Sequence, residues 1–314
     1  MNRLRQIAPF LLTFCLFLLA VWAIKEEFKH YTFQDLVNSL GRIPTGDKLM
    51  SVFLMIPGYL SMAGYDWLGF IYVGRHLHPG TIVRTSFISY ALGNTVGFTV
   101  FSGTAIRYRF YSPAGVSNID IAKVIAFTHL SFWLGMLTIG GVSFLVDPLA
   151  VPQILKIPVQ SARSLGIIFL CLVALYFWFI AFAKKPLKFG GVELGVPSVN
   201  ISLALIVVAF IDWGLAAAVL YVLLPDSYTI SFFGFFGIYI FAMTAGVISN
   251  VPGGLGVFEF MMLKLRPESV SESDLLGALL AYRGIYYLLP LSIAFIMLVS
   301  YEVEKKYRRS KDNS

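Results

Sequence analysis

Residues 248–260 read ISNVPGGLGVFEF and close an apolar run that begins at residue 231. That run of about twenty residues has the length of a helix that spans a bilayer. Proline and glycine weaken a helix, and a carboxylate inside lipid is costly. A chain that places a proline, closely spaced glycines and Glu259 at this depth therefore departs from an ordinary spanning helix.

The composition is that of a polytopic membrane protein. Hydrophobic residues make up 58% of the 314 residues and charged residues 13%, whereas about a quarter of the residues in a soluble domain are charged. We predict an all-α fold, a polytopic transmembrane helical bundle with a single membrane domain over 1–304 and a basic cytoplasmic tail over 305–314. About eight hydrophobic segments lie near 7–24, 50–74, 86–101, 119–146, 164–183, 200–224, 231–250 and 275–301.

The distribution of Lys and Arg predicts how these segments cross the membrane, because basic loops favour the cytoplasmic side. If every segment simply crosses, 11 basic residues lie inside and 12 outside, which is no bias. If 86–101 turns back and 252–266 makes an extra, broken crossing, 15 lie inside and 8 outside, with Arg283 left out of both counts. We therefore expect re-entrant or broken helices near 86–103 and 250–266, and both termini in the cytoplasm.

The residues of both irregular segments agree with this topology. Residues 86–103 hold too many small and polar side chains for a helix that faces lipid. Five extended residues and nine or ten helical ones at 252–266 would reach roughly 30 Å, the hydrocarbon thickness. Non-helical backbone is tolerated there only if it is buried in protein or lines a wet cavity, so we expect a cavity, with an ordinary surface loop as the alternative. The residues of this structural break are Pro252, Gly253, Gly254 and Gly256.

Three separated motifs, GNTVGFTVFSGTAIRYRFY (93–111), NVPGGLGVFE (250–259) and AYRGIYYLLPL (281–291), carry a family resemblance. Together they resemble the membrane-embedded flippase region of the bacterial lysylphosphatidylglycerol synthetase/flippase (multiple peptide resistance factor) family and its stand-alone membrane relatives. Longer members continue into a soluble aminoacyltransferase domain, whereas this sequence ends at Ser314. The resemblance therefore implies lipid translocation rather than lipid synthesis, and it does not identify the lipid.

We accordingly expect a flippase-like protein of the bacterial inner membrane. It would move a phospholipid, with aminoacylated phosphatidylglycerol as one candidate, or a lipid-linked group between leaflets. Its partners would be membrane phospholipids, and a second copy of the chain or a lipid-modifying enzyme are further candidates. The alternatives are a non-catalytic membrane partner of a lipid-handling enzyme and, less favoured, a membrane-embedded transferase.

Ionisable residues within spans are candidates for function, because each costs roughly 2.5–3.5 kcal/mol on insertion scales. The candidates are Asp66, Asp212, Glu259 and Arg283. One interpretation is a polar path in which Arg283 meets a lipid phosphate and the acids meet the rest of the headgroup. The alternative is structural: Asp66 and Asp212 would each make a buried hydrogen bond or a salt bridge to Arg283, and Glu259 would cap backbone N–H groups at the break.

Further candidates for contact with the substrate lie beside the breaks. Arg107 and Arg109 end the re-entrant stretch and could collect anionic headgroups, or only anchor the chain to the cytoplasmic leaflet. Asn94 and Asn250 flank the two breaks and are open to either interpretation. The resemblance adds Tyr282, which precedes Arg283 in the YRxxYY motif.

The sequence offers little for an enzyme. It contains no GxSxG, HExxH or dinucleotide-binding motif. We expect no catalytic residue, metal or cofactor, and no nucleic-acid partner, since the basic tail suits an anionic leaflet and no nucleic-acid-binding fold accompanies it.

The charge distribution predicts that residues 75–84 and 104–118 both face the cytoplasm. In a variant that lacks Cys15 and Cys171, a cysteine replacing Ser112 should resist a membrane-impermeant maleimide in intact spheroplasts and react after permeabilisation. A cysteine replacing Ser161, in a loop predicted outside, should react in both. Strong labelling of the residue-112 cysteine in intact spheroplasts would contradict this topology.

Overall fold

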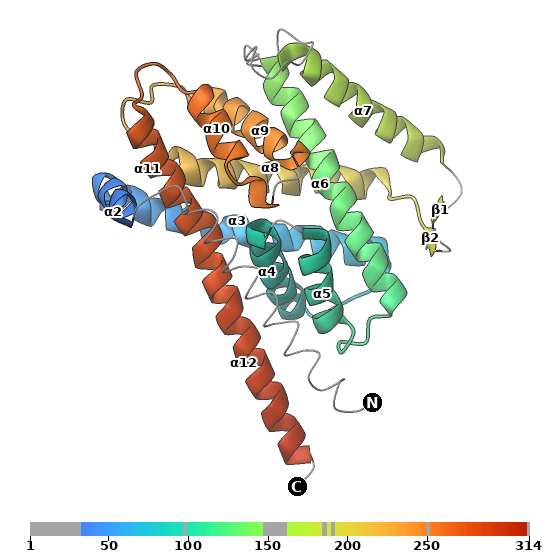
Figure 1. Cartoon of the computed structure of the whole chain (residues 1–314). Helices are drawn as coiled ribbons and strands as arrows, with labels where there is room; N and C mark the ends of the chain where they lie inside the picture. Colours follow the sequence, from blue (N-terminus) through green and yellow to red (C-terminus); the bar gives the residue numbers. More distant parts are fainter. Residues whose placement is uncertain are drawn as a thin grey trace.

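The computed structural model describes residues 33–96, 99–146, 162–183, 187–189, 192–249 and 252–312 (Figure 1). The elements, in chain order, are α2 (Phe33–Arg42), α3 (Thr45–Tyr72), α4 (Pro79–Val96), α5 (Thr99–Tyr111), α6 (Asn118–Val146), α7 (Ala162–Phe182), β1 (Leu187–Phe189), β2 (Val192–Leu194), α8 (Val199–Tyr221), α9 (Phe232–Ile248), η3 (Pro252–Gly254), α10 (Val257–Lys264), α11 (Glu272–Tyr282), η4 (Arg283–Leu288) and α12 (Leu289–Asp312). The predicted all-α class is confirmed, and within the described residues the one addition is the short antiparallel pair β1–β2.

Four of the described helical stretches are long and apolar enough to cross a bilayer: Asn118–Val146, Arg163–Phe182, Val199–Tyr221 and Glu272–Glu304. Helix α3, of 28 residues, contains most of the predicted segment 50–74, and the apolar α9 has only 17 residues. The predicted segment 7–24 lies outside the described residues. The fold is therefore a bundle of membrane-length helices with shorter apolar helices between them.

The predicted re-entrant segment near 86–103 is confirmed as a hairpin of α4 and α5. An ion pair of 3.0 Å joins Arg75, before α4, to Asp120 at the start of α6. The hydroxyl of Tyr108, late in α5, donates to the carbonyl of Asn118 at 3.1 Å. Both ends of the hairpin thus lie at one side of the bundle, here named the basic side.

The predicted irregular segment near 250–266 is confirmed as a break followed by the eight-residue α10, which turns back along α9, and its crossing of the membrane stays a prediction. Gly253, Gly254 and Gly256 have φ angles of 62°, 65° and 74°, a region that favours glycine. The chain reverses there, and Ser269 beyond α10 donates to the carbonyl of Ser227 before α9 at 3.1 Å. Helices α9 and α10 therefore form a second re-entrant hairpin, which enters from the side opposite the basic side and leaves Lys264 on its predicted side.

The tips of the two hairpins meet inside the bundle, where η3 lies against the end of α4 (Figure 1). A Cβ atom at Gly253 would lie 3.3 Å from the carbonyl oxygen of Thr95 and 3.5 Å from that of Asn94. The predicted break thus packs against the end of α4 at Gly253, although Gly253 and Gly254 are only half-buried and Gly256 is exposed, and a surface loop stays the alternative. The predicted cavity stays a prediction; a described cavity of about 220 Å³ lies elsewhere, beside Arg42 and Asp274.

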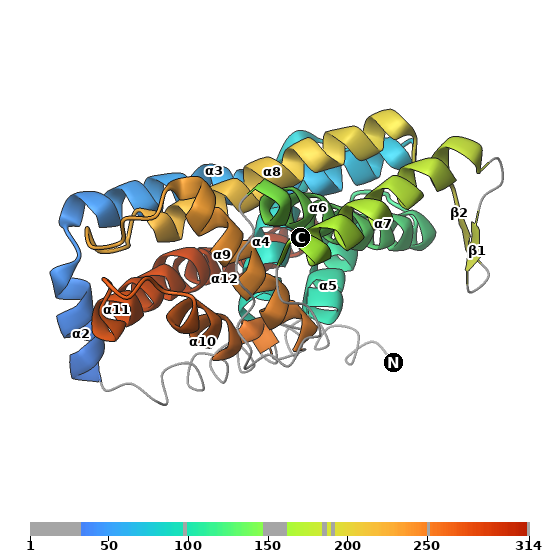
Figure 2. The same ribbon diagram turned by 90° about the horizontal axis from the view of Figure 1, so that it is seen from above.

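The hairpins belong to two units of opposite direction. The first unit is α3, the α4–α5 hairpin and α6; the second is α8, the α9–α10 hairpin and the helix from α11 to α12. Helices α3 and α8 lie side by side (Figure 2) and run antiparallel, since Gly58 faces Leu215 and Gly64 faces Val208. The arrangement is that of an inverted-topology repeat, which we did not recognise in the sequence.

The close contact of α6 with α8 gives a test of this packing. A Cβ at Gly135 would lie 2.6 Å from the Cβ of Ala209, whereas one at Gly214 would meet nothing within 4 Å. Alanine favours a helix interior over glycine by about 1 kcal/mol at both positions, but overpacking costs about 1–3 kcal/mol. We expect Gly135→Ala to lower the midpoint of thermal unfolding in detergent and Gly214→Ala to maintain or raise it. Equal midpoints for both variants would contradict the packing of α6 on α8.

Candidate functional site

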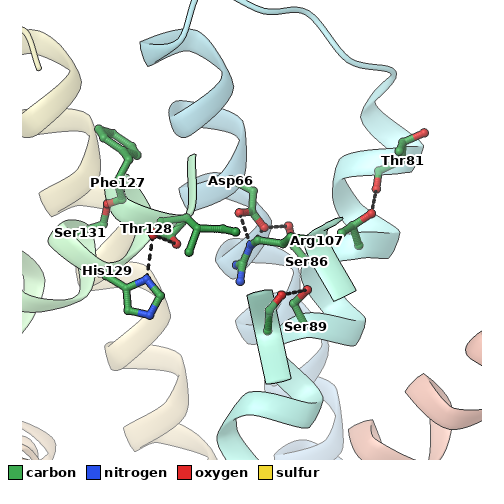
Figure 3. Close-up of polar contacts among 12 residues, drawn as sticks. Asp66, Thr81, Ser86, Ser89, Arg107, Phe127, Thr128, His129 and Ser131 are labelled. Carbon is green, nitrogen blue, oxygen red and sulfur yellow. Dashed lines mark hydrogen bonds and ion pairs between the residues drawn. The ribbon is translucent and has the colours of Figure 1, made fainter. Parts of the chain in front are cut away.

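The first buried ion pair joins Asp66 of α3 to Arg107 of α5 (Figure 3). The guanidinium Nε donates to Oδ1 at 2.8 Å and Nη2 donates to Oδ2 at 3.1 Å. Ser86 of α4 donates a further hydrogen bond to Oδ2, and the guanidinium lies 4.9 Å from the ring centroid of Tyr90. The side chains of Arg107 and Asp66 are only 2% and 0% exposed, so these contacts replace the water that both groups lose.

The close approach of α4 and α5 positions Arg107 for this pair. A Cβ at Gly103 would lie 3.0 Å from Nη1 of Arg107. The hydroxyl of Ser89 on α4 donates to the Gly103 carbonyl at 3.4 Å (Figure 3). Glycine at position 103 therefore leaves room for the guanidinium beside the α4 backbone.

The second buried pair joins Glu259 of α10 to Arg283, the first residue of the π-helical turn η4. The Nε and Nη2 atoms of Arg283 lie 2.8 and 2.7 Å from Oε1 of Glu259. Its Nη1 donates to the Gly253 carbonyl at 3.1 Å, and the ring of Tyr287 lies 4.5 Å from the guanidinium. The other carboxylate oxygen, Oε2, accepts a hydrogen bond of 2.9 Å from the Gly256 N–H.

Asp212 on α8 is the third buried acid and is only 8% exposed. The hydroxyl of Tyr65 on α3 donates to its Oδ2 at 3.0 Å. Within the part of the chain that the structure describes, Asp212 has no ion-pair partner. This carboxyl group therefore differs from those of Asp66 and Glu259, each of which contacts a guanidinium.

Comparison with known proteins identifies the family of this chain. The family model described as the lysylphosphatidylglycerol synthase TM region matches residues 6–294. The chain belongs to this family. It is 42% identical to the uncharacterized protein slr0712 of Synechocystis over 100% of this chain and 98% of that protein.

Two other relatives extend the comparison. Identity is 32% with the inner membrane protein YbhN of Escherichia coli, over 85% of this chain and 83% of YbhN. It is 29% with the phosphatidylglycerol lysyltransferase of Staphylococcus epidermidis, over 100% of this chain but only 36% of that protein. The chain thus spans about a third of the length of the lysyltransferase, and the resemblance read from its motifs is confirmed as family membership.

The contacts of Arg283 agree in part with those that we predicted from the sequence. Arg283 does lie within salt-bridge reach of an acid, Glu259, and Glu259 also caps Gly256 as the structural alternative proposed. A salt bridge from Arg283 to Asp66 or Asp212 is wrong, because Asp66 pairs with Arg107. The buried hydrogen bond that was the other structural alternative is present at both acids, donated by Tyr65 to Asp212 and by Ser86 to Asp66. These contacts do not test whether any of the residues binds a lipid.

The two arginines of α5 lie in different surroundings. We expected Arg107 and Arg109 together at the membrane surface, but the reversal into α5 turns Arg107 into the bundle against α3. Arg109 pairs with Glu302 of α12 near the basic side, and its side chain is 9% exposed. Both arginines are therefore largely covered and held in ion pairs, Arg107 inside the bundle and Arg109 near the end of the hairpin.

The remaining predicted residues lie around the hairpin tips. The carbonyl oxygen of Asn94 is next to Gly253, and its side chain interacts with the Tyr59 hydroxyl. Tyr282 is fully buried, with its hydroxyl 2.9 Å from that of Tyr239. Asn250 lies outside the described residues, and the side chain of Pro252 is likewise not described.

Sequence reasoning missed the uncharged partners of the buried acids. Tyr65 and Ser86 contact Asp212 and Asp66, and Tyr90 and Tyr287 stack on the two guanidiniums. The one available signal was the density of tyrosines next to the charged motifs, as in Gly-Tyr-Asp and Tyr-Arg-Gly-Ile-Tyr-Tyr. Among the described residues no three His, Cys, Asp or Glu side chains gather as a metal site, and the absence of a metal stays a prediction.

The two ion pairs predict selective coupling in a double-mutant cycle. Arg283→Gln alone leaves Glu259 buried without its cation and should destabilise the protein by about 3–5 kcal/mol. Adding Glu259→Gln should recover part of this loss, because both charges are then removed. The cycle is measured by unfolding in detergent.

A crossed combination is the matched control. Arg283→Gln with Asp66→Asn removes one member of each pair, so the two costs should add. If the crossed combination shows the same recovery as Arg283→Gln with Glu259→Gln, the pairs are not those described above.

Proposed function

We propose that this protein translocates a phospholipid, or a lipid-linked group, between the leaflets of the bacterial inner membrane, and that it is not itself an enzyme. The observation that carries the proposal is the set of charges buried beside the two hairpins: Asp66, Arg107, Asp212, Glu259 and Arg283. Each intramembrane charge costs roughly 2.5–3.5 kcal/mol on insertion scales. A bundle that only had to be stable could fill these positions with apolar side chains, often at no loss of stability.

The relatives support a lipid substrate. One relative is named phosphatidylglycerol lysyltransferase and another inner membrane protein. The region shared with the lysyltransferase is only 36% of that protein, so its activity is not carried over to this chain. Translocation, rather than transfer of a lysyl group, is the function that we assign to the shared membrane region.

The arginine pairs provide a mechanism for headgroup recognition. A guanidinium binds phosphate in the same forked geometry in which it binds a carboxylate. A lipid phosphate that reaches the tips would replace Glu259 at Arg283, and the freed carboxylate would keep its hydrogen bond from Gly256. The acyl chains would stay in the bilayer beside apolar faces such as that of α7, where Trp178 and Phe182 are exposed.

The orientation and partners follow from the same proposal. The basic side, which holds Arg75 and Lys123, would face the cytoplasm, together with both termini. Membrane phospholipids are the partners required, and a second copy of the chain or a lipid-modifying enzyme would be accessory. The competing function is a non-catalytic scaffold for such an enzyme, which needs the fold but not the buried charges.

Reconstitution into liposomes with fluorescent lipids of different headgroups tests the function. Wild-type protein should move at least one lipid between leaflets. The double variant Glu259→Gln with Arg283→Gln should fold, since neither charge is left alone, but should lose most of this activity. The measurement is the fraction of labelled lipid reduced by external dithionite over time.

The exposed pair Arg75–Asp120 provides the control, because its two side chains lie within one unit and away from the tips. Arg75→Gln with Asp120→Asn also removes two opposite charges and should transport at the wild-type rate. If the Glu259–Arg283 double variant transports as fast as this control, the buried charges are structural. If the wild type moves no lipid, the scaffold function is favoured.

A further inference from the structure

The buried charges of the bundle do not balance. Each of the acids Asp66 and Glu259 has a guanidinium nitrogen 2.8 Å from a carboxylate oxygen. Asp212 has the Tyr65 hydroxyl at 3.0 Å and, among the described residues, no cation. One buried carboxyl group is therefore left without the countercharge that the other two possess.

The elements packed around Asp212 place tyrosine side chains next to it. Tyr59 and Tyr65 of α3, Tyr90 of α4, Tyr239 of α9 and Tyr286 of η4 are its titratable neighbours. A phenol is uncharged near neutral pH, since it ordinarily titrates near pH 10. None of these side chains can neutralise a carboxylate.

The charged and titratable groups farther out have other contacts. Tyr90 neighbours both Asp212 and the guanidinium of Arg107, and Tyr239 neighbours both Asp212 and Arg283. His129 of α6 has its Nδ1 2.7 Å from the Ile125 carbonyl (Figure 3), and its buried Nε2 has no hydrogen-bond partner among the described residues. On α7 and α11, Tyr176 contacts Ser202 and Tyr282 contacts Tyr239.

An isolated carboxylate in a low-dielectric site is so costly that the group takes up a proton instead. We infer that Asp212 is a proton-binding site and that one proton is bound and released there in each cycle of lipid movement. A proton from water forms an O–H bond to a carboxylate oxygen, and on release it returns to water as the carboxylate regains its charge. No oxidation or reduction takes place.

The geometry favours a proton over a metal cation. Hard cations such as Ca²⁺ and Mg²⁺ bind six or more oxygen ligands. The described site offers the carboxylate and the Tyr65 hydroxyl. A proton needs one oxygen only, and a protonated carboxyl can still accept the hydrogen bond that Tyr65 donates.

Proton binding can be measured without any lipid. In purified wild-type protein, infrared spectra should show the C=O stretching band of a protonated carboxyl group, with a small shift in D₂O. Asp212→Asn should remove this band and Asp212→Glu should move it. Asp66→Asn should leave it unchanged, because Asp66 contacts the guanidinium of Arg107 and not Asp212. If no band between about pH 5 and pH 9 depends on residue 212, Asp212 is not a proton site and the inference is overturned.

The coupling to lipid rests on the proposed function and needs a second experiment. In liposomes, one proton per cycle and a gradient of one pH unit would support a lipid asymmetry of up to about tenfold. Wild type should build such an asymmetry, whereas Asp212→Asn should not respond to the gradient. Wild-type transport that ignores the gradient overturns the coupling.

The two failures are distinguishable. An infrared band assigned to Asp212 together with no lipid movement rejects the proposed function and leaves the proton site in place. Lipid movement without that band rejects the proton site and leaves the proposed function in place. If Asp212→Asn does not fold, Asp212→Glu carries both measurements, because it keeps a carboxyl group at this position.

Discussion

One guanidinium holds the tip of the second hairpin in place. Arg283 contacts the carboxylate of Glu259 and the carbonyl of Gly253, while Glu259 in turn accepts the N–H of Gly256. Backbone that leaves a helix at membrane depth must find hydrogen-bond partners inside the protein. Because these side chains supply them, the chain can reverse at the glycines, and the tip can lie against the end of α4. The second hairpin, and the contact of its tip with the end of the first, depend on this arrangement.

Much of the bundle could be predicted from residues alone, and the exceptions have physical causes. The small and polar residues of 86–103 correctly indicated a re-entrant segment. The glycines after Pro252 indicated a break but not how far into the bundle its tip would reach, since left-handed φ angles permit a reversal at any depth. Charge counting could not decide this depth, because Lys264 and Arg266 lie on the same side whether or not the hairpin crosses completely.

The pairing of charges was less predictable than their presence. Asp66 meets Arg107 because α5 returns beside α3, and that contact spans 41 residues. Asp212 meets Tyr65 because α3 and α8 run antiparallel, with 147 residues between the partners. Neither contact can be predicted from the residues next to each charged position in the sequence. The family motifs identified the charged positions, but only the three-dimensional arrangement shows which charge each one neutralises.

The distribution of ion pairs over the two units indicates which contacts can change during function. Asp66–Arg107 lies within the first unit and Glu259–Arg283 within the second, whereas the hydrogen bond from Tyr65 to Asp212 joins the units at depth.

At opposite ends of the bundle, Arg42 of α2, which precedes the first unit, contacts Asp274 of the second unit, and Arg109 of the first unit contacts Glu302 of the second. Breaking a buried pair costs about 3–5 kcal/mol, but an exposed pair such as Arg42–Asp274 contributes only about 0–1 kcal/mol. Relative motion of the units would keep the two expensive pairs and break the exposed Arg42–Asp274 contact at little cost. The buried hydrogen bonds from Tyr65 to Asp212 and from Tyr59 to the Tyr286 carbonyl both join the units, and the bond at Asp212 is the one that a proton on this carboxyl group would change directly.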